Sequence, residues 1–138
     1  MEITITHSEG NLPVTILKPH GVLDAASYGE LIEAAQSEYE IGARRMIVDL
    51  SDVAHMSSAG IVALHTILKL LQGSEPAQAE SGWEATRAVA QKGGIGPQGR
   101  FKLLSPQPYV DQVLDMVGFK KFIDVYTDEE TAIASFDN

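Results

Sequence analysis

The sequence predicts a single α/β domain in which helices pack on a mixed, largely parallel sheet. Its 138 residues are enough for one hydrophobic core and too few for two. Hydrophobic residues at 44% and charged residues at 21% are values typical of globular proteins. Strand-length apolar runs alternate with helical stripes along the chain. That alternation is typical of parallel strands joined by right-handed helical crossovers.

The first elements are a β-hairpin and a helix. Residues 3–5 and 14–17 are apolar or alternating over strand length, and the turn-forming residues 9–13 separate them. Pro19 and Gly21 are expected to break the second strand. A helix then follows, because its apolar residues recur at i, i+3, i+4 and i+7: Tyr28, Leu31, Ile32 and Ala35.

Residues 44–71 form the predicted centre of the fold. The predicted strand runs from Met46 to Leu50, and its first three residues are apolar without alternation, which favours a middle strand covered on both faces. A short polar loop follows and ends in two serines and a glycine. The next helix has apolar residues on more than one face: Ile61, Val62, Leu64, Ile67, Leu68, Leu70 and Leu71. Such a helix is covered from a second direction, by more chain or by a partner, which leaves a homo-oligomer open.

Residues 73–100 differ in composition, being small, polar and glycine-rich. We interpret them as a flexible insertion within one domain that spans residues 1–138, not as a second domain. Residues 94–99, GIGPQG, match the letters of a dinucleotide-binding loop. That loop needs a strand before it and a helix after it, whereas here a strand follows and Pro97 lies inside. No cofactor is therefore expected.

The last part of the chain contains two more strands and two more helices. A strand is predicted over residues 101–104, and Pro108 suits the first turn of the helix after it. Gly118 is expected to end that helix, and residues 122–126 to form the last strand. Thr127 and Glu130 have the spacing of a capping box at the start of the final helix.

Composition also excludes several function classes. The net charge of −9 argues against a nucleic-acid partner, since nucleic-acid binding needs a basic surface. The absence of cysteine excludes disulfides and thiolate sites and suits a cytoplasmic protein. The longest apolar run, residues 59–71, is interrupted by polar side chains and is too short to cross a membrane. Residues 1–3 lack the basic start of a signal peptide.

No catalytic constellation or metal site is expected, so the protein is predicted not to be an enzyme. Asp49, Asp52 and His55 could suggest metal ligands, but they lie at a strand end and turn where solvated polar residues are common. Ser58 and His65 could suggest a nucleophile and a base. They are about two helical turns, or about 10 Å of rise, apart, which is far for a proton transfer.

The serine pair Ser57 and Ser58 is the candidate functional site. A serine at a helix N-terminus accepts a hydrogen bond from an unpaired backbone amide, and capping alone explains such a residue. The same place also suits a phosphate, because free amides and the helix dipole favour an anion and Gly60 keeps the approach uncrowded. A phosphoserine would add a charge of about −1.5 to −2. Both interpretations remain open from the residues alone.

The sequence VDLSDVAHMSSAGI over residues 48–61 resembles the signature of the STAS domain, a module of sulphate transporters and anti-sigma factor antagonists. GVLD at residues 21–24 and the segments 106–118 and 122–136 support the resemblance, which covers nearly the whole chain except residues 73–100. It implies a sheet of four to five strands with helices packed on it.

The resemblance also implies a switch. In antagonists of this family, the serine that matches Ser58 is phosphorylated by an anti-sigma factor serine kinase. Only the unphosphorylated form binds that kinase, and a serine phosphatase restores it. Many relatives carry aspartate where this chain has Ser57, and a second serine or threonine where it has Ala59. Asp24 matches an acidic residue near the switch serine, and it could equally cap a helix from Ala25.

Two alternatives to the switch remain. One is a STAS subunit of a larger signalling or lipid-transport assembly that is never phosphorylated. The other is an enzyme or nucleotide binder on the same scaffold, for which the sequence offers no catalytic residues.

Overall fold

The structure is a computed structural model that describes residues 1–9, 12–72 and 100–137. The proposed insertion, apart from Arg100, and the GIGPQG motif lie outside these residues. The regular elements, in chain order, are β1 (Glu2–Glu9), β2 (Pro13–Leu23), α1 (Tyr28–Glu40), β3 (Met46–Asp49), β4 (Val53–Met56), α2 (Ser58–Gln72), β5 (Phe101–Leu104), α4 (Pro108–Met116), η3 (Phe119–Lys121), β6 (Asp124–Tyr126), α5 (Glu129–Ala134) and η4 (Ser135–Asp137).

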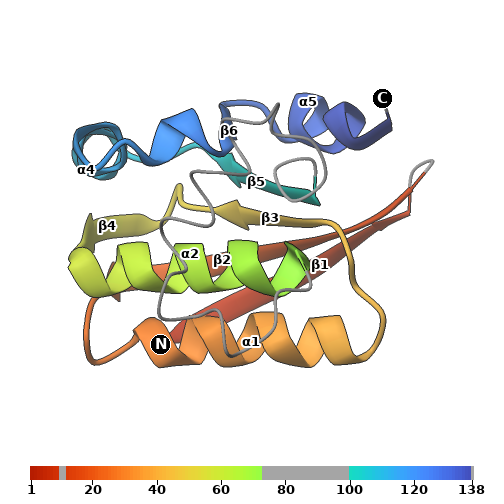
Figure 1. Cartoon of the computed structure of the whole chain (residues 1–138), viewed down its shortest axis with the longest axis horizontal. Coiled ribbons are helices and arrows are strands. Elements are labelled where there is room, and N and C mark those ends of the chain that lie inside the picture. The colour runs from red at the N-terminus through yellow and green to blue at the C-terminus, as the bar shows by residue number, and fades with distance from the viewer. Residues whose placement is uncertain (10–11, 73–99, 138) are drawn as a thin grey trace.

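The strands form one mixed sheet in the order β1-β2-β3-β5-β6, with β4 paired to β2 (Figure 1). β1 and β2 are the antiparallel hairpin, and every other pairing is parallel. The predicted fold class, a single α/β domain with a largely parallel mixed sheet, is confirmed. β3 lies in the middle of the sheet and all four of its residues are buried, as the unbroken apolar run indicated.

Two strand predictions are wrong, and both concern the segment that leads to the serine pair. β2 is not broken at residues 19–21 but continues to Leu23, and Gly21 within it has a φ of +108°. Its first part pairs with β3, and its last three residues pair with β4, with a register shift between Gly21 and Val22. The predicted polar loop contains β4. Because only Val53 and Met56 of this strand are buried, its sequence has a weak apolar pattern.

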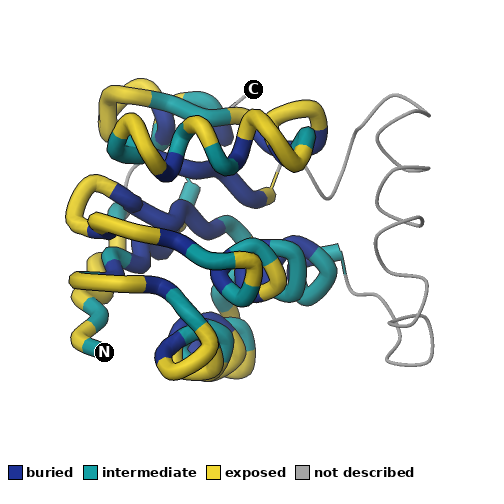
Figure 2. The backbone as a smooth tube through the Cα atoms, turned by 90° about the vertical axis from the view of Figure 1, so that its left-hand side faces the viewer, coloured by how far each residue is buried: buried dark blue, intermediate teal, exposed yellow. Residues whose placement is uncertain are grey.

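Helices cover both faces of the sheet. The larger core lies on the face packed against α1, α2 and α4, and it includes Leu17, Leu31 and Leu64. The smaller core lies on the opposite face, where α5 packs against residues such as Ile16 and Ile47. Figure 2 shows the dark-blue buried backbone in the interior of the described domain and exposed yellow segments around it. Every helix in the described ranges is too short or too polar to span a bilayer.

The C-terminal part also differs from the prediction at two points. After α4, Gly118 adopts the left-handed conformation expected for it, with φ of +76°, but a 3₁₀ turn over Phe119–Lys121 precedes β6. Thr127 does not cap α5. Asp128 does, because its carboxylate accepts a hydrogen bond from the Thr131 amide at 2.9 Å.

Candidate functional site

The predicted site residues come together where β2 and β4 end side by side, near the start of α2 at the left-hand edge in Figure 1. Leu23 pairs with Met56, and the Ser57 amide donates to the Leu23 carbonyl at 3.0 Å. The residues after each strand, Asp24 and Ser57, are therefore neighbours along this edge. β4 determines that arrangement, since without it residues 50–57 would have no fixed register against β2.

The two serines have different structural roles. Ser57 caps α2: its hydroxyl oxygen accepts from the Ala59 amide at 3.2 Å, and its carbonyl accepts from the Gly60 amide at 2.9 Å. Ser58 is the first residue of the helix and is exposed, and its hydroxyl has no hydrogen-bond partner among residues 1–9, 12–72 and 100–137. Capping therefore explains Ser57 and does not explain the Ser58 side chain.

The expected supply of free amides at the helix N-terminus is smaller than predicted. The amides of Ala59, Gly60 and Ile61 all donate to Ser57, the last of them over 3.4 Å to its carbonyl. An anion on Ser58 would therefore depend mainly on the helix dipole and on solvent, and less on direct amide contacts.

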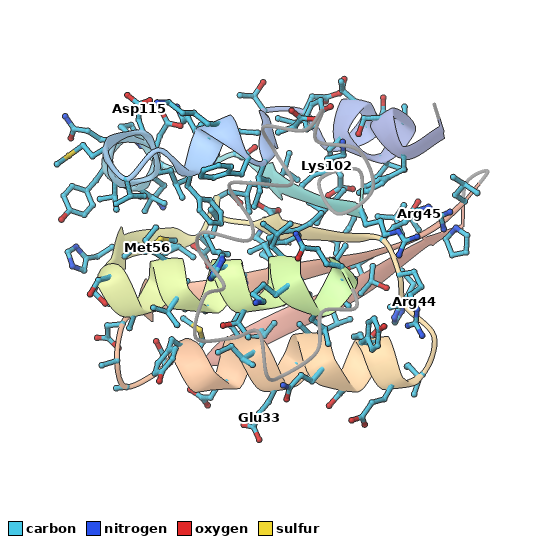
Figure 3. The ribbon with its side chains drawn as sticks, viewed as in Figure 1. Glu33, Arg44, Arg45, Met56, Lys102 and Asp115 are labelled. Carbon is cyan, nitrogen blue, oxygen red and sulfur yellow. The ribbon has the colours of Figure 1, made fainter. Side chains whose placement is uncertain are left out.

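Gly60 has a packing role that the sequence did not reveal. A Cβ atom at this position would lie 2.4 Å from the Met56 Cγ, 3.1 Å from the Leu23 carbonyl oxygen and 3.2 Å from the Leu23 Cγ. Figure 3 shows Met56 at the end of β4, beside the first turn of α2. The glycine allows this turn to lie directly against the ends of β2 and β4. It thereby sets the position of Ser58 relative to Asp24 and does not serve to keep a ligand path open.

Asp24 stabilises the turn that connects β2 to α1. Its Oδ1 accepts from the Ala26 amide at 3.0 Å, and its carbonyl accepts from the Ser27 and Tyr28 amides. α1 begins at Tyr28, so the prediction that Asp24 caps a helix from Ala25 is wrong. The half-buried carboxylate nevertheless lies on the same edge as the serine pair and contributes a negative charge there.

Exposed apolar and aromatic residues surround this edge. The sequence had singled out two of them, Val62 on the broad apolar surface of its helix and His55 as a possible metal ligand. Val22 is 43% exposed and pairs with His55 across β2 and β4. The His55 ring stacks on Tyr109 of α4, with centroids 5.0 Å apart. On α2, Val62 lies one turn after Ser58 on the same helix face and is 50% exposed. We call Val22, His55, Ser58, Val62 and Tyr109 the Ser58 surface.

The residues considered as metal ligands point to separate partners. Asp49 accepts from the Ser51 amide at 3.0 Å, Asp52 contacts the His20 ring, and His55 stacks on Tyr109. Within the part of the chain that the structure describes, no group of three histidine or acidic side chains could hold a metal ion.

Comparisons with known proteins agree with this architecture. The STAS domain family model matches residues 2–75, more than half of the chain. No curated protein matches the chain.

Solved structures are similar over almost the whole length. The TM1081 protein of Thermotoga maritima, a candidate anti-sigma factor antagonist, is 19% identical with a TM-score of 0.69, over 97% of this chain and 95% of that chain. An anti-sigma factor antagonist of Mycobacterium paratuberculosis is 17% identical with a TM-score of 0.65, over 99% of this chain and 96% of that chain. The phosphorylated form of the Bacillus cell fate determinant SpoIIAA is 17% identical with a TM-score of 0.57, over 95% and 97%. At these identities the likeness concerns the fold, and together with the family match it shows that the chain belongs to the STAS domain family.

Proposed function

We propose that this protein is an anti-sigma factor antagonist that is switched by phosphorylation of Ser58. In its unphosphorylated form it sequesters an anti-sigma factor serine kinase, and a serine phosphatase returns it to that form. The observation that carries the proposal is the exposed Ser58 hydroxyl, which has no structural task in the described residues while its neighbour Ser57 holds the helix cap. The family match and the likeness to antagonists support it.

Phosphorylation at this position would change the surface and leave the fold intact. A phosphate would add a charge of about −1.5 to −2 at an exposed site, and the positive end of the α2 dipole would tolerate it. The new charge would lie next to Val62 and on the same edge as the Asp24 carboxylate. A partner that packs on the apolar part of the Ser58 surface would have to desolvate that phosphate, which costs binding energy.

The proposed role is regulatory and not catalytic, and it places the protein in the cytoplasm, where sigma factors act. It requires no cofactor. It also treats residues 1–138 as one STAS domain, with residues 73–100 as an insertion between α2 and β5.

Incubation with the cognate kinase and ATP, followed by mass spectrometry, tests the proposal. We expect one phosphate, on Ser58, and none on a Ser58→Ala variant. Ser57→Ala is the matched control, because it removes the adjacent hydroxyl and should still be phosphorylated at Ser58. A phosphate that maps to Ser57, or an unmodified wild-type protein after incubation with a kinase active on its own substrate, would contradict the proposal.

A second candidate function is a STAS subunit of a larger signalling or lipid-transport assembly. The exposed Val22, Val62 and Tyr109 favour a stable protein contact at the Ser58 surface, whether or not a kinase is involved. Co-purification separates the two candidates. A partner retained equally by wild-type protein and by Ser58→Asp indicates a permanent assembly, whereas a partner lost only from Ser58→Asp indicates the switch.

A further inference from the structure

β1 is a long sheet edge without the usual protection. The sheet ends at β1 on one side and at β6 on the other, and β6 has three residues whereas β1 has eight. Natural proteins block edge strands with short length, proline, lysine or bulges, because an open edge can pair with another strand. β1 contains no proline or lysine, and its charged residues, Glu2 and Glu9, lie at its two ends.

The hydrogen bonds of β2 determine which backbone groups of β1 face outward. The Thr15 amide donates to the Arg45 carbonyl at 2.9 Å, on the side of β3, and therefore points away from β1. Thr15 pairs with His7, so this is a non-hydrogen-bonded pair and the N–H and C=O groups of His7 also point away from β2. By alternation, the same holds for Ile5 and Ile3. These three residues present donors and acceptors to an incoming strand.

The sequence of β1 is complementary to itself in the antiparallel direction. In a register centred on Ile5, Ile5 faces Ile5 of the second copy and Ile3 faces His7. The other pairs are Thr4 with Thr6 and Glu2 with Ser8, so no like charges lie opposite each other. β-Branched pairs of this kind stabilise antiparallel strands, and like charges opposite each other destabilise them.

We propose that a second copy of this chain pairs with β1 through a twofold axis at Ile5, which joins two sheets into one. In this register three outward-facing pairs would form about two hydrogen bonds each. The Ile5 side chain, now 38% exposed, would pack against its symmetry mate. The contact is small, because each copy contributes the single strand β1 to it. An interface of this size is expected to be weak and concentration-dependent.

Sedimentation equilibrium of the whole chain tests the proposal over concentrations from low micromolar to near-millimolar. We expect the mass to rise from 14.9 kDa towards twice that value. Ile5→Lys and Ile5→Glu should each remain at 14.9 kDa, because each places two like charges across the axis. An equimolar mixture of these two variants should dimerise again, since the charges are then opposite.

Two further variants probe the backbone contact. Ile5→Pro removes an outward-facing N–H that β2 does not use, so it should abolish dimerisation and leave the circular dichroism spectrum unchanged. Ile5→Val keeps that N–H and should dimerise like the wild type. A wild-type mass that stays at 14.9 kDa at all concentrations would overturn the proposal. That result would also be obtained if β1 pairs only with a strand of a different protein. Equal dimerisation of the wild type and of both charged variants would also overturn it, because the interface would then lie elsewhere.

Discussion

Replacing Gly60 by alanine tests how the site is positioned. In an open helix, alanine is more favourable than glycine by about 0.8–1 kcal/mol. At Gly60, however, the new Cβ would lie 2.4 Å from the Met56 Cγ and 3.1 Å from the Leu23 carbonyl oxygen. Met56 is buried and the carbonyl belongs to the β2 backbone, so neither can move freely. Overpacking of this kind costs about 1–3 kcal/mol, which outweighs the gain in helix propensity.

We therefore expect Gly60→Ala to lower the free energy of unfolding by up to about 2 kcal/mol, which is the overpacking cost less the gain in helix propensity. For a chain of this length, that corresponds to a fall in Tm of about 3–4 °C per kcal/mol. Urea unfolding followed by circular dichroism measures the free energy, and differential scanning calorimetry measures the Tm.

Gly29 provides a matched control, because it also lies in the first turn of a helix but has no atom within 4 Å of its would-be Cβ. Gly29→Ala should raise the free energy of unfolding by about 0.5 kcal/mol. A stabilising effect of Gly60→Ala equal to that of Gly29→Ala would refute the inferred close packing of α2 on β2 and β4. If the Gly60→Ala variant is less stable than wild type but binds the kinase with unchanged affinity, the inference that Gly60 positions Ser58 is refuted.

Two other predictions concern helix caps. Ser57→Ala should cost about 1 kcal/mol in the free energy of unfolding, because the Ala59 amide loses its acceptor. Ser58→Ala should change the same free energy by less than about 0.5 kcal/mol. Equal effects of the two variants in urea unfolding would contradict the finding that Ser57, and not Ser58, caps α2. At Asp128, hydrogen bonds from the side chain and then the backbone of Thr131 hold the pKa of the carboxyl below its ordinary value. A lowered pKa in the folded state means that this stabilisation is present above the unfolded-state pKa and is lost as the pH falls through the folded-state pKa. We therefore compare the free energy of unfolding near neutral pH with that at acid pH below about 4. The decrease should be smaller for Asp128→Asn than for wild type, and an identical decrease would contradict the role of the Asp128 carboxylate as the cap of α5.

The helices and the central strand could be predicted because their cores depend on local periodicity. Leu31 and Ala35 of α1, and Leu64 and Leu68 of α2, were placed on apolar stripes and are fully buried. β4 could not be predicted in this way, because a strand of four residues with two exposed positions has no distinctive pattern. It pairs with the last three residues of β2, across a register shift between Gly21 and Val22, and only the folded sheet reveals this pairing.

The sequence predicted that the serine pair lies at a helix start, and α2 does begin there. It could not distinguish the serine that caps the helix from the serine that is exposed. The capping residue of α5 was likewise displaced by one position, from Thr127 to Asp128, because both side chains can accept the same kind of hydrogen bond. The stacking of His55 on Tyr109 joins segments far apart in the chain, and no local signal indicates it.

The proposed function requires that the charge on Ser58 control binding of the anti-sigma factor serine kinase. The most direct measurement is titration calorimetry of the purified kinase with three forms of the protein: unmodified, stoichiometrically phosphorylated on Ser58, and Ser58→Ala. We predict equal affinity for the unmodified form and Ser58→Ala, and an affinity at least about 100-fold lower for the phosphorylated form, which corresponds to about 2.7 kcal/mol. Equal affinity of the kinase for the phosphorylated and unmodified forms would show that Ser58 is not the switch.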